Sequence, residues 1–145
     1  MHALTSSWQF WAVLAAVFAA LTAIFAKIGV AGVNSDFATF VRTLVVIAAL
    51  AAVLSLTGQW QAPGSIPART YLFLALSGLA TGASWLCYFR ALQMGQASLV
   101  APIDKLSVVL VAIFAVTFLG EKLSFANWSG IAMIAGGAVL VALKT

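Results

Sequence analysis

Two charged residues, Asp104 and Lys105, stand side by side in the apolar stretch Leu99–Leu110, LVAPIDKLSVVL. A charge inside a membrane segment costs about 2.5–3.5 kcal/mol on insertion scales, so such residues usually face a helix-bundle interior or a water-filled cavity. Asp104 is too short to reach far toward the headgroups, and it follows Pro102, which removes a backbone donor and frees a carbonyl near residue 98. Neighbouring helical residues point about 100° apart, so we expect Asp104 and Lys105 to meet other helices rather than each other.

Two interpretations of Asp104 stay open. It can be a carboxylate near a helix start, stabilised by the positive end of the helix dipole. It can also belong to a polar cavity, as a proton or ion site.

A stripe of polar side chains is the second feature that could do chemistry. Ser77, Thr81, Ser84 and Tyr88 follow the spacing i, i+4, i+7, i+11, which is one helical face, and Trp85 flanks them. Hydroxyls beside an interior aromatic suit a pathway for a small organic molecule. Hydroxyls also join helices or bond back to their own backbone carbonyls, and the sequence does not decide between these interpretations.

Three basic residues, Lys27, Arg42 and Arg90, lie within about two turns of the ends of apolar runs. Long basic side chains there can reach the headgroups, so interface anchoring is the first interpretation of each. Arg90 is also a candidate site residue, because basic side chains beside a cavity suit a neutral or acidic metabolite.

The side chains that enzymes and metal sites use are nearly missing. His2 is the only histidine and Cys87 the only cysteine, and the three acids, Asp36, Asp104 and Glu121, belong to different segments. We therefore expect no catalytic site, no metal and no cofactor. Glu121 is interpreted as structural, either pairing near its turn or capping the last helix.

The composition defines the class of protein. Of 145 residues, 64% are hydrophobic and only 7% are charged, and the mean hydropathy is +1.14. A soluble domain of this length cannot hide that much apolar surface, so the chain is predicted to be an integral membrane protein. The net charge of +4 comes from scattered Lys and Arg residues, so nucleic acid is not an expected partner.

The apolar runs predict one all-α transmembrane domain over residues 1–145. Five helices of about 20 residues are expected, with Asp36 as the N-cap candidate of the second. Their predicted bounds are about 8–28, 37–56, 70–92, 99–119 and 126–143.

The chain resembles the EamA domain of the drug/metabolite transporter superfamily. The similar segments are YFRAL at the end of the third span, APIDKLSVVLV opening the fourth, LGEKLS at its end, AIFAKIGV in the first and the arginine of FVRTL in the second. Small multidrug exporters of that superfamily use a glutamate in the first helix, and this first helix carries no acid. If transport is coupled to protons here, Asp104 is therefore the candidate.

The resemblance implies a five-helix half of a transporter or exporter of small metabolites or drugs in the cell inner membrane. Most relatives carry two such domains, and an odd helix count makes the second an inverted copy. A lone domain then needs a homodimer, antiparallel if the inversion is kept, or a second five-helix subunit. Counting Lys and Arg gives two on one side of the membrane and five on the other, or two against three without the intramembrane Arg42 and Lys105, a weak bias compatible with dual insertion.

On this hypothesis the partners are the lipid bilayer and a small-molecule substrate. The candidate residues of the substrate or coupling site are Asp104, Lys105, Tyr88, Trp85, Ser84 and Arg90. The alternative is a non-transporting membrane assembly factor or partner subunit with the same fold. Its signature would be a network in which every charge is paired and no cavity is left.

Overall fold

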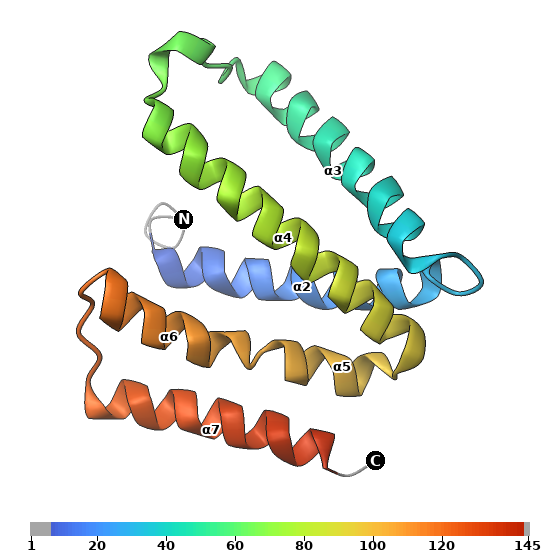
Figure 1. Ribbon diagram of the computed structural model, residues 1–145, viewed down its shortest axis with the longest axis vertical. Coiled ribbons are helices and arrows are strands. Elements are labelled where there is room, and N and C mark those ends of the chain that lie inside the picture. Colours follow the sequence, from blue (N-terminus) through green and yellow to red (C-terminus); the bar gives the residue numbers. More distant parts are fainter. Residues whose placement is uncertain (1–6, 144–145) are drawn as a thin grey trace. The chain divides into compact units, whose positions relative to one another are not determined.

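The computed structural model describes residues 7–143 (Figure 1). Within that range every regular element is helical: α2 (Trp8–Gly29), α3 (Ser35–Thr57), the 3-10 turn η1 (Pro63–Ser65), α4 (Ala68–Met94), α5 (Ala97–Asp104), α6 (Ser107–Phe118) and α7 (Phe125–Ala142). Five spans in this part of the chain are long and apolar enough to cross a membrane, with α5 and α6 together forming the fourth. The prediction of an all-α, five-span membrane protein is confirmed.

The helices form two compact units. In the unit Phe25–Met94, α3 and α4 lie side by side as an antiparallel hairpin closed through η1 (Figure 1). In the other unit, which holds the described residues on either side of that segment, α7 packs against α5 and α6. That residues 1–145 form a single domain stays a prediction.

Both ends of α3 are fixed by local chemistry. Asn34, in extended conformation, accepts hydrogen bonds at its side-chain oxygen from the backbone N–H groups of Asp36 (2.9 Å) and Phe37 (3.1 Å). The N-cap is therefore Asn34, and the prediction of Asp36 was wrong: the helix begins at Ser35, which places Asp36 in its first turn. At the other end Gly58 adopts φ +66°, a left-handed conformation that favours glycine, and donates its N–H to Leu54 O.

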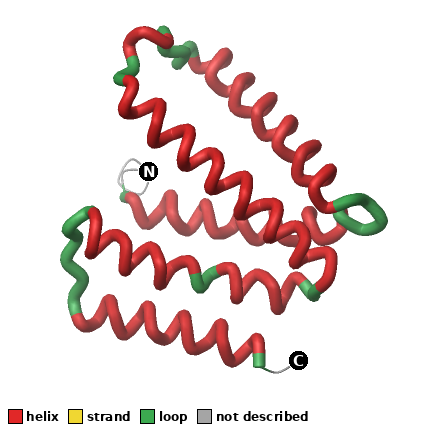
Figure 2. The backbone as a smooth tube through the Cα atoms, viewed as in Figure 1, coloured by secondary structure: helices red, strands yellow, loops and turns green. Residues whose placement is uncertain are grey.

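The fourth span is interrupted near its middle. Helix α5 ends at Asp104 and α6 begins at Ser107, and Figure 2 shows the loop segment between them. The Lys105 N–H donates to Pro102 O at 3.1 Å, an i→i−3 bond that replaces the regular helical pattern. The break lies just after Pro102, which itself stands inside α5, and it interrupts the continuous helix predicted for residues 99–119.

The described residues bury little apolar surface within one chain. The buried apolar residues are mostly alanines, which let helices approach closely: Ala23, Ala26, Val30, Phe89, Leu92, Ala112, Ala115 and Ala138. Most large apolar side chains of the spans are exposed, as expected for surfaces that meet lipid or another subunit.

Candidate functional site

The Arg42 guanidinium lies on the indole ring of Trp85, inside the α3–α4 hairpin. Its Cζ is 3.8 Å from the centroid of the Trp85 ring and 5.6 Å from that of Phe89. Arg42 is the eighth residue of α3, about 10 Å along the axis from the helix start. The side chain thus extends across to α4, where the aromatic face offers the guanidinium a cation–π partner. The interpretation of Arg42 as an interface anchor stays a prediction.

One nitrogen of this guanidinium is left without a partner. Arg42 Nη1 is buried and makes no hydrogen bond within residues 7–143. A buried charged donor of this kind is costly unless it is paired, since a ring face attracts the cation but does not accept its N–H groups in their own plane. The arrangement can therefore receive an oxygen atom, ideally an anionic one.

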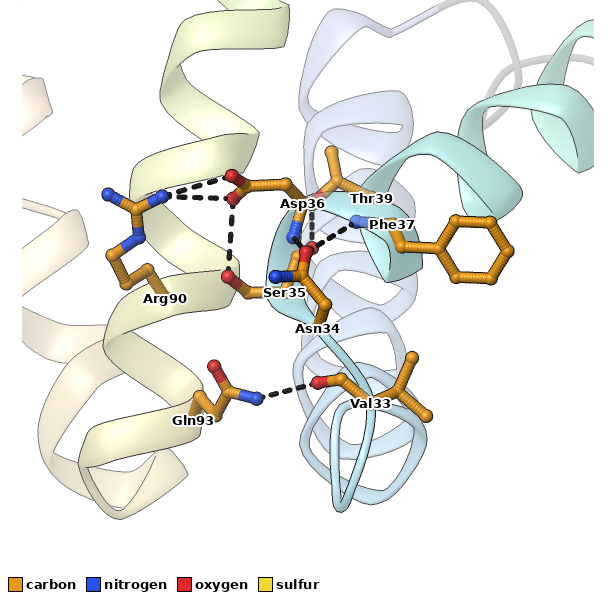
Figure 3. Close-up of polar contacts among 8 residues, drawn as sticks. All are labelled: Val33, Asn34, Ser35, Asp36, Phe37, Thr39, Arg90 and Gln93. Carbon is orange, nitrogen blue, oxygen red and sulfur yellow. Dashed lines mark hydrogen bonds and ion pairs between the residues drawn. The ribbon is translucent and has the colours of Figure 1, made fainter.

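Arg90, a predicted site residue, is held by a carboxylate. Its Nη2 donates to both Oδ1 and Oδ2 of Asp36, each at 3.1 Å, and Ser35 Oγ donates to Oδ1 at 3.2 Å (Figure 3). The Arg90 and Asp36 side chains are 62% and 49% exposed, at the end of the hairpin where α3 begins. The pair connects α3 to α4, and its positive charge is already neutralised.

Two further contacts fix the same end of the hairpin. Lys27 Nζ donates to Leu92 O at 2.6 Å, so this lysine also binds protein rather than headgroups alone. Gln93 Nε2 donates to Val33 O at 2.7 Å, which joins the end of α4 to the loop before α3 (Figure 3). The polar residues at this end thus hold backbone that the helix termini leave unsatisfied.

Asp104 and Lys105 pair with each other in the second unit. Lys105 Nζ lies 3.1 Å from Asp104 Oδ2, with the two side chains 55% and 36% exposed. The expectation that these neighbours would not face each other was wrong, because α5 ends at Asp104 and the 100° helical spacing no longer separates them. The break thus carries a charge pair.

The predicted polar stripe on α4 is only partly available for a ligand. Thr81 Oγ1 donates back to Ser77 O at 2.8 Å, so this hydroxyl is used within its own helix. Ser84 is exposed, and Tyr88 is partly buried. Trp85, next to them, contacts the guanidinium of Arg42.

Glu121 lies exposed in the loop after α6, and the cap of α7 is Ser124, whose hydroxyl accepts from the Asn127 N–H at 3.2 Å. The suggestion that Glu121 caps this helix was therefore wrong. Across residues 7–143 no group of three His, Cys, Asp or Glu residues could hold a metal ion, and His2 lies outside the described part.

Sequence reasoning missed Arg42 as a site residue. Its depth was the available signal, since Arg42 stands seven residues inside a span whereas Lys27 and Arg90 stand near span ends. Its aromatic partner lies 43 residues further along the chain, and only the packing of α3 on α4 brings the two together.

Comparison with known proteins places the chain among transporters. The model of the EamA-like transporter family matches residues 6–143. A Sinorhizobium sp. protein described as "Uncharacterized transporter in cobO 3'region" is 66% identical over 140 residues, which is 97% of this chain and 99% of that protein. No solved structure matches the chain.

Proposed function

Because the chain belongs to the EamA-like transporter family, we propose that it carries small organic metabolites or drugs across the cell inner membrane. The observation that carries this proposal is the broken fourth span, with Asp104 and Lys105 at the break. Irregular backbone and charge at membrane depth are tolerated where they pack inside protein or line water, and transporter sites commonly form at such broken helices.

Two groups of side chains, one in each unit, are our separate candidates for contact with the substrate. Asp104 and Lys105 supply the polar surface at the break. On α4, Trp85, Ser84 and Tyr88 supply an aromatic and hydroxyl surface. Arg90, paired with Asp36 and exposed at the end of the hairpin, is the remaining candidate for contact with the substrate.

The proposed working unit contains two five-span chains. The large exposed apolar area of each span requires a second surface or lipid, and an odd number of spans allows two copies to form an inverted pair. An antiparallel homodimer is the form we favour, and a second five-helix subunit is the other form that meets the same need.

The pathway can be tested without knowing the substrate. In a Cys87→Ser background, Ser107→Cys at the break and Val111→Cys one turn further on are treated with a membrane-impermeant methanethiosulfonate reagent. Both parent side chains are exposed on the single chain, so the comparison separates water from lipid. We expect the reagent to label the cysteine at position 107 rapidly and the cysteine at position 111 not at all. If neither cysteine is labelled, the fourth span does not line the pathway.

Transport itself is measured in proteoliposomes with a panel of radiolabelled amino acids, organic acids and sugars. Accumulation by the wild type that is lost in Asp104→Asn supports the proposal. If transport is proton-coupled through Asp104, that variant also loses its dependence on pH.

Orientation is tested by labelling single cysteines in intact cells. One cysteine is placed in the loop Gln59–Ser65 and one at the C-terminal end, again with Cys87→Ser. If each site labels in part of the population, both orientations exist and an antiparallel homodimer is supported. If only one site labels, all copies insert one way and a different partner must complete the unit.

A second candidate function is a non-transporting assembly or partner subunit, and the two ion pairs favour it. Asp36 with Arg90 and Asp104 with Lys105 are neutralised within the chain, as a purely structural role would require. The unpaired nitrogen of Arg42 argues against it, because a complete structural network leaves no buried donor open. Absence of labelling at 107 together with absence of transport would favour this candidate.

A further inference from the structure

We propose that Arg42 is the anion-binding residue of this transporter and that its ligand is a small organic molecule bearing a carboxylate or phosphate. This deepens the proposed function, on which it rests, by naming the substrate class. The sequence alone indicated Asp104 and Lys105 as site residues. The buried donor without a hydrogen-bond acceptor is instead Arg42 Nη1, on the α3–α4 hairpin.

Charge counting within the described residues leaves Arg42 without a carboxylate. Asp36 is held by Arg90, and Asp104 is held by Lys105. Glu121, the remaining acid, lies in the loop after α6, outside the spans. A guanidinium seven residues inside α3 therefore has no carboxylate partner among residues 7–143.

The geometry of the guanidinium favours an oxyanion. Trp85 covers one face at 3.8 Å and fixes the plane, so the N–H groups point outward along the edges of that plane. Nη1 is the edge donor that nothing accepts. The Arg42 residue is only partly buried as a whole, but Nη1 itself is covered within the chain, so an anion reaches this nitrogen only by displacing the side chains that cover it. A planar fork of donors matches the two oxygens of a carboxylate or phosphate.

Two sources can supply such an oxyanion. One is the transported molecule, and the other is a lipid headgroup, since an arginine about 10 Å inside a span can reach toward the phosphates. We commit to the transported molecule, because the stacking on Trp85 directs the guanidinium across to α4 rather than along the helix to the surface.

The test uses Trp85 as the reporter. The other tryptophans, Trp8, Trp11, Trp60 and Trp128, are replaced by Phe, and the full-length protein is placed in lipid nanodiscs. Succinate, benzoate and glycerol 3-phosphate are titrated as probes, with uncharged glycerol as a blank, in phosphatidylcholine discs and in discs that also contain phosphatidylglycerol. An anion bound to the guanidinium changes the electric field at the indole ring of Trp85. We therefore expect the Trp85 fluorescence to change as the anion is added and to level off when the site is full.

Three variants define the expected result. Arg42→Gln weakens the affinity for the anion at least about tenfold, because a charge-assisted pair of hydrogen bonds is lost. Arg42→Lys keeps the positive charge but loses the planar pair of N–H donors, so its affinity for the anion lies between those of the wild type and Arg42→Gln. Arg69→Gln is the matched control: Arg69 is also an arginine beside an aromatic, 5.8 Å from Phe73, but at the start of α4, and its loss leaves binding unchanged.

Two outcomes overturn the proposal. If none of the three anions gives a saturable change in either lipid, or if Arg42→Gln binds as the wild type does, Arg42 is not the site. If the emission follows the phosphatidylglycerol content and ignores the free anions, the lipid headgroup is the ligand.

The transport assay separates this proposal from the proposed function. If the wild type transports neutral solutes but Trp85 does not respond to anions, transport stands and the anion site fails. If anions bind at Arg42 but no solute of the panel is transported, the site stands and the transport function fails.

Discussion

Breaking the ion pair between Asp36 and Arg90 should loosen the α3–α4 hairpin by a measurable but modest amount. The carboxylate accepts from a single Arg90 nitrogen at 3.1 Å and both side chains are about half exposed, so the pair itself contributes about 0.5–1 kcal/mol, as surface pairs do. Asp36 also stands in the first turn of α3, where a negative charge gains about 0.3–1 kcal/mol from the helix dipole. Asp36→Asn should therefore lower the free energy of unfolding by about 1–2 kcal/mol, and Arg90→Gln by about 0.5–1 kcal/mol.

The coupling is obtained from a double-mutant cycle. The two single variants and the double variant are unfolded from detergent micelles with increasing SDS, followed by circular dichroism and tryptophan fluorescence. We expect the double variant to lose about 0.5–1 kcal/mol less than the sum of the singles, and the difference to shrink in 1 M salt. Asp36→Asn combined with Arg69→Gln is the control and should be additive. Additivity of Asp36→Asn with Arg90→Gln, within about 0.2 kcal/mol, would refute the assignment of the pair.

The remaining predictions use the same unfolding measurement. Asn34→Ala should cost about 1 kcal/mol because two backbone N–H groups at the start of α3 lose their acceptor, whereas Asn34→Ser should cost little; equal losses would contradict the capping role. Gly58→Ala should cost about 1–2 kcal/mol because alanine is strained at φ +66°, and an unchanged stability would mean that the turn relaxes. Lys27→Met should cost about 1.5–3 kcal/mol because the buried Leu92 carbonyl loses a charged donor, while Lys122→Met in the exposed loop should cost nothing measurable.

The positions of the spans follow from the sequence because lipid tolerates few alternatives. The second span, predicted at 37–56, is Ser35–Thr57, and the third, predicted at 70–92, is Ala68–Met94. A run of about 20 apolar residues must be helical in a bilayer, so the bounds depend on local composition alone. The exact ends of the helices are harder to predict, because several residues near an end can serve as the cap. Asn34 and Asp36 are both good N-cap residues, and the structure shows that α3 begins at Ser35, directly after Asn34.

The candidate site could be predicted only in part, because its geometry depends on how helices pack. Pro102 indicated irregular backbone, but the end of α5 at Asp104 and the resulting pair with Lys105 are properties of the break. The contact between Arg42 and Trp85 needs the register of α3 on α4, which no local pattern encodes. Hydrophobic periodicity gives little help here, since both helices are strongly apolar over most of their length.

The hydroxyl groups of α3 have a consequence for biogenesis. Thr39, Thr43, Ser55 and Thr57 each donate to the carbonyl four residues earlier at 2.8 Å, so their polarity is concealed before any neighbouring helix arrives. What α3 cannot conceal by itself is the charge of Arg42 and Asp36, and both find their partners on α4. If these two helices leave the translocation machinery together as a hairpin, each charged side chain enters the lipid already in contact with its partner on α4.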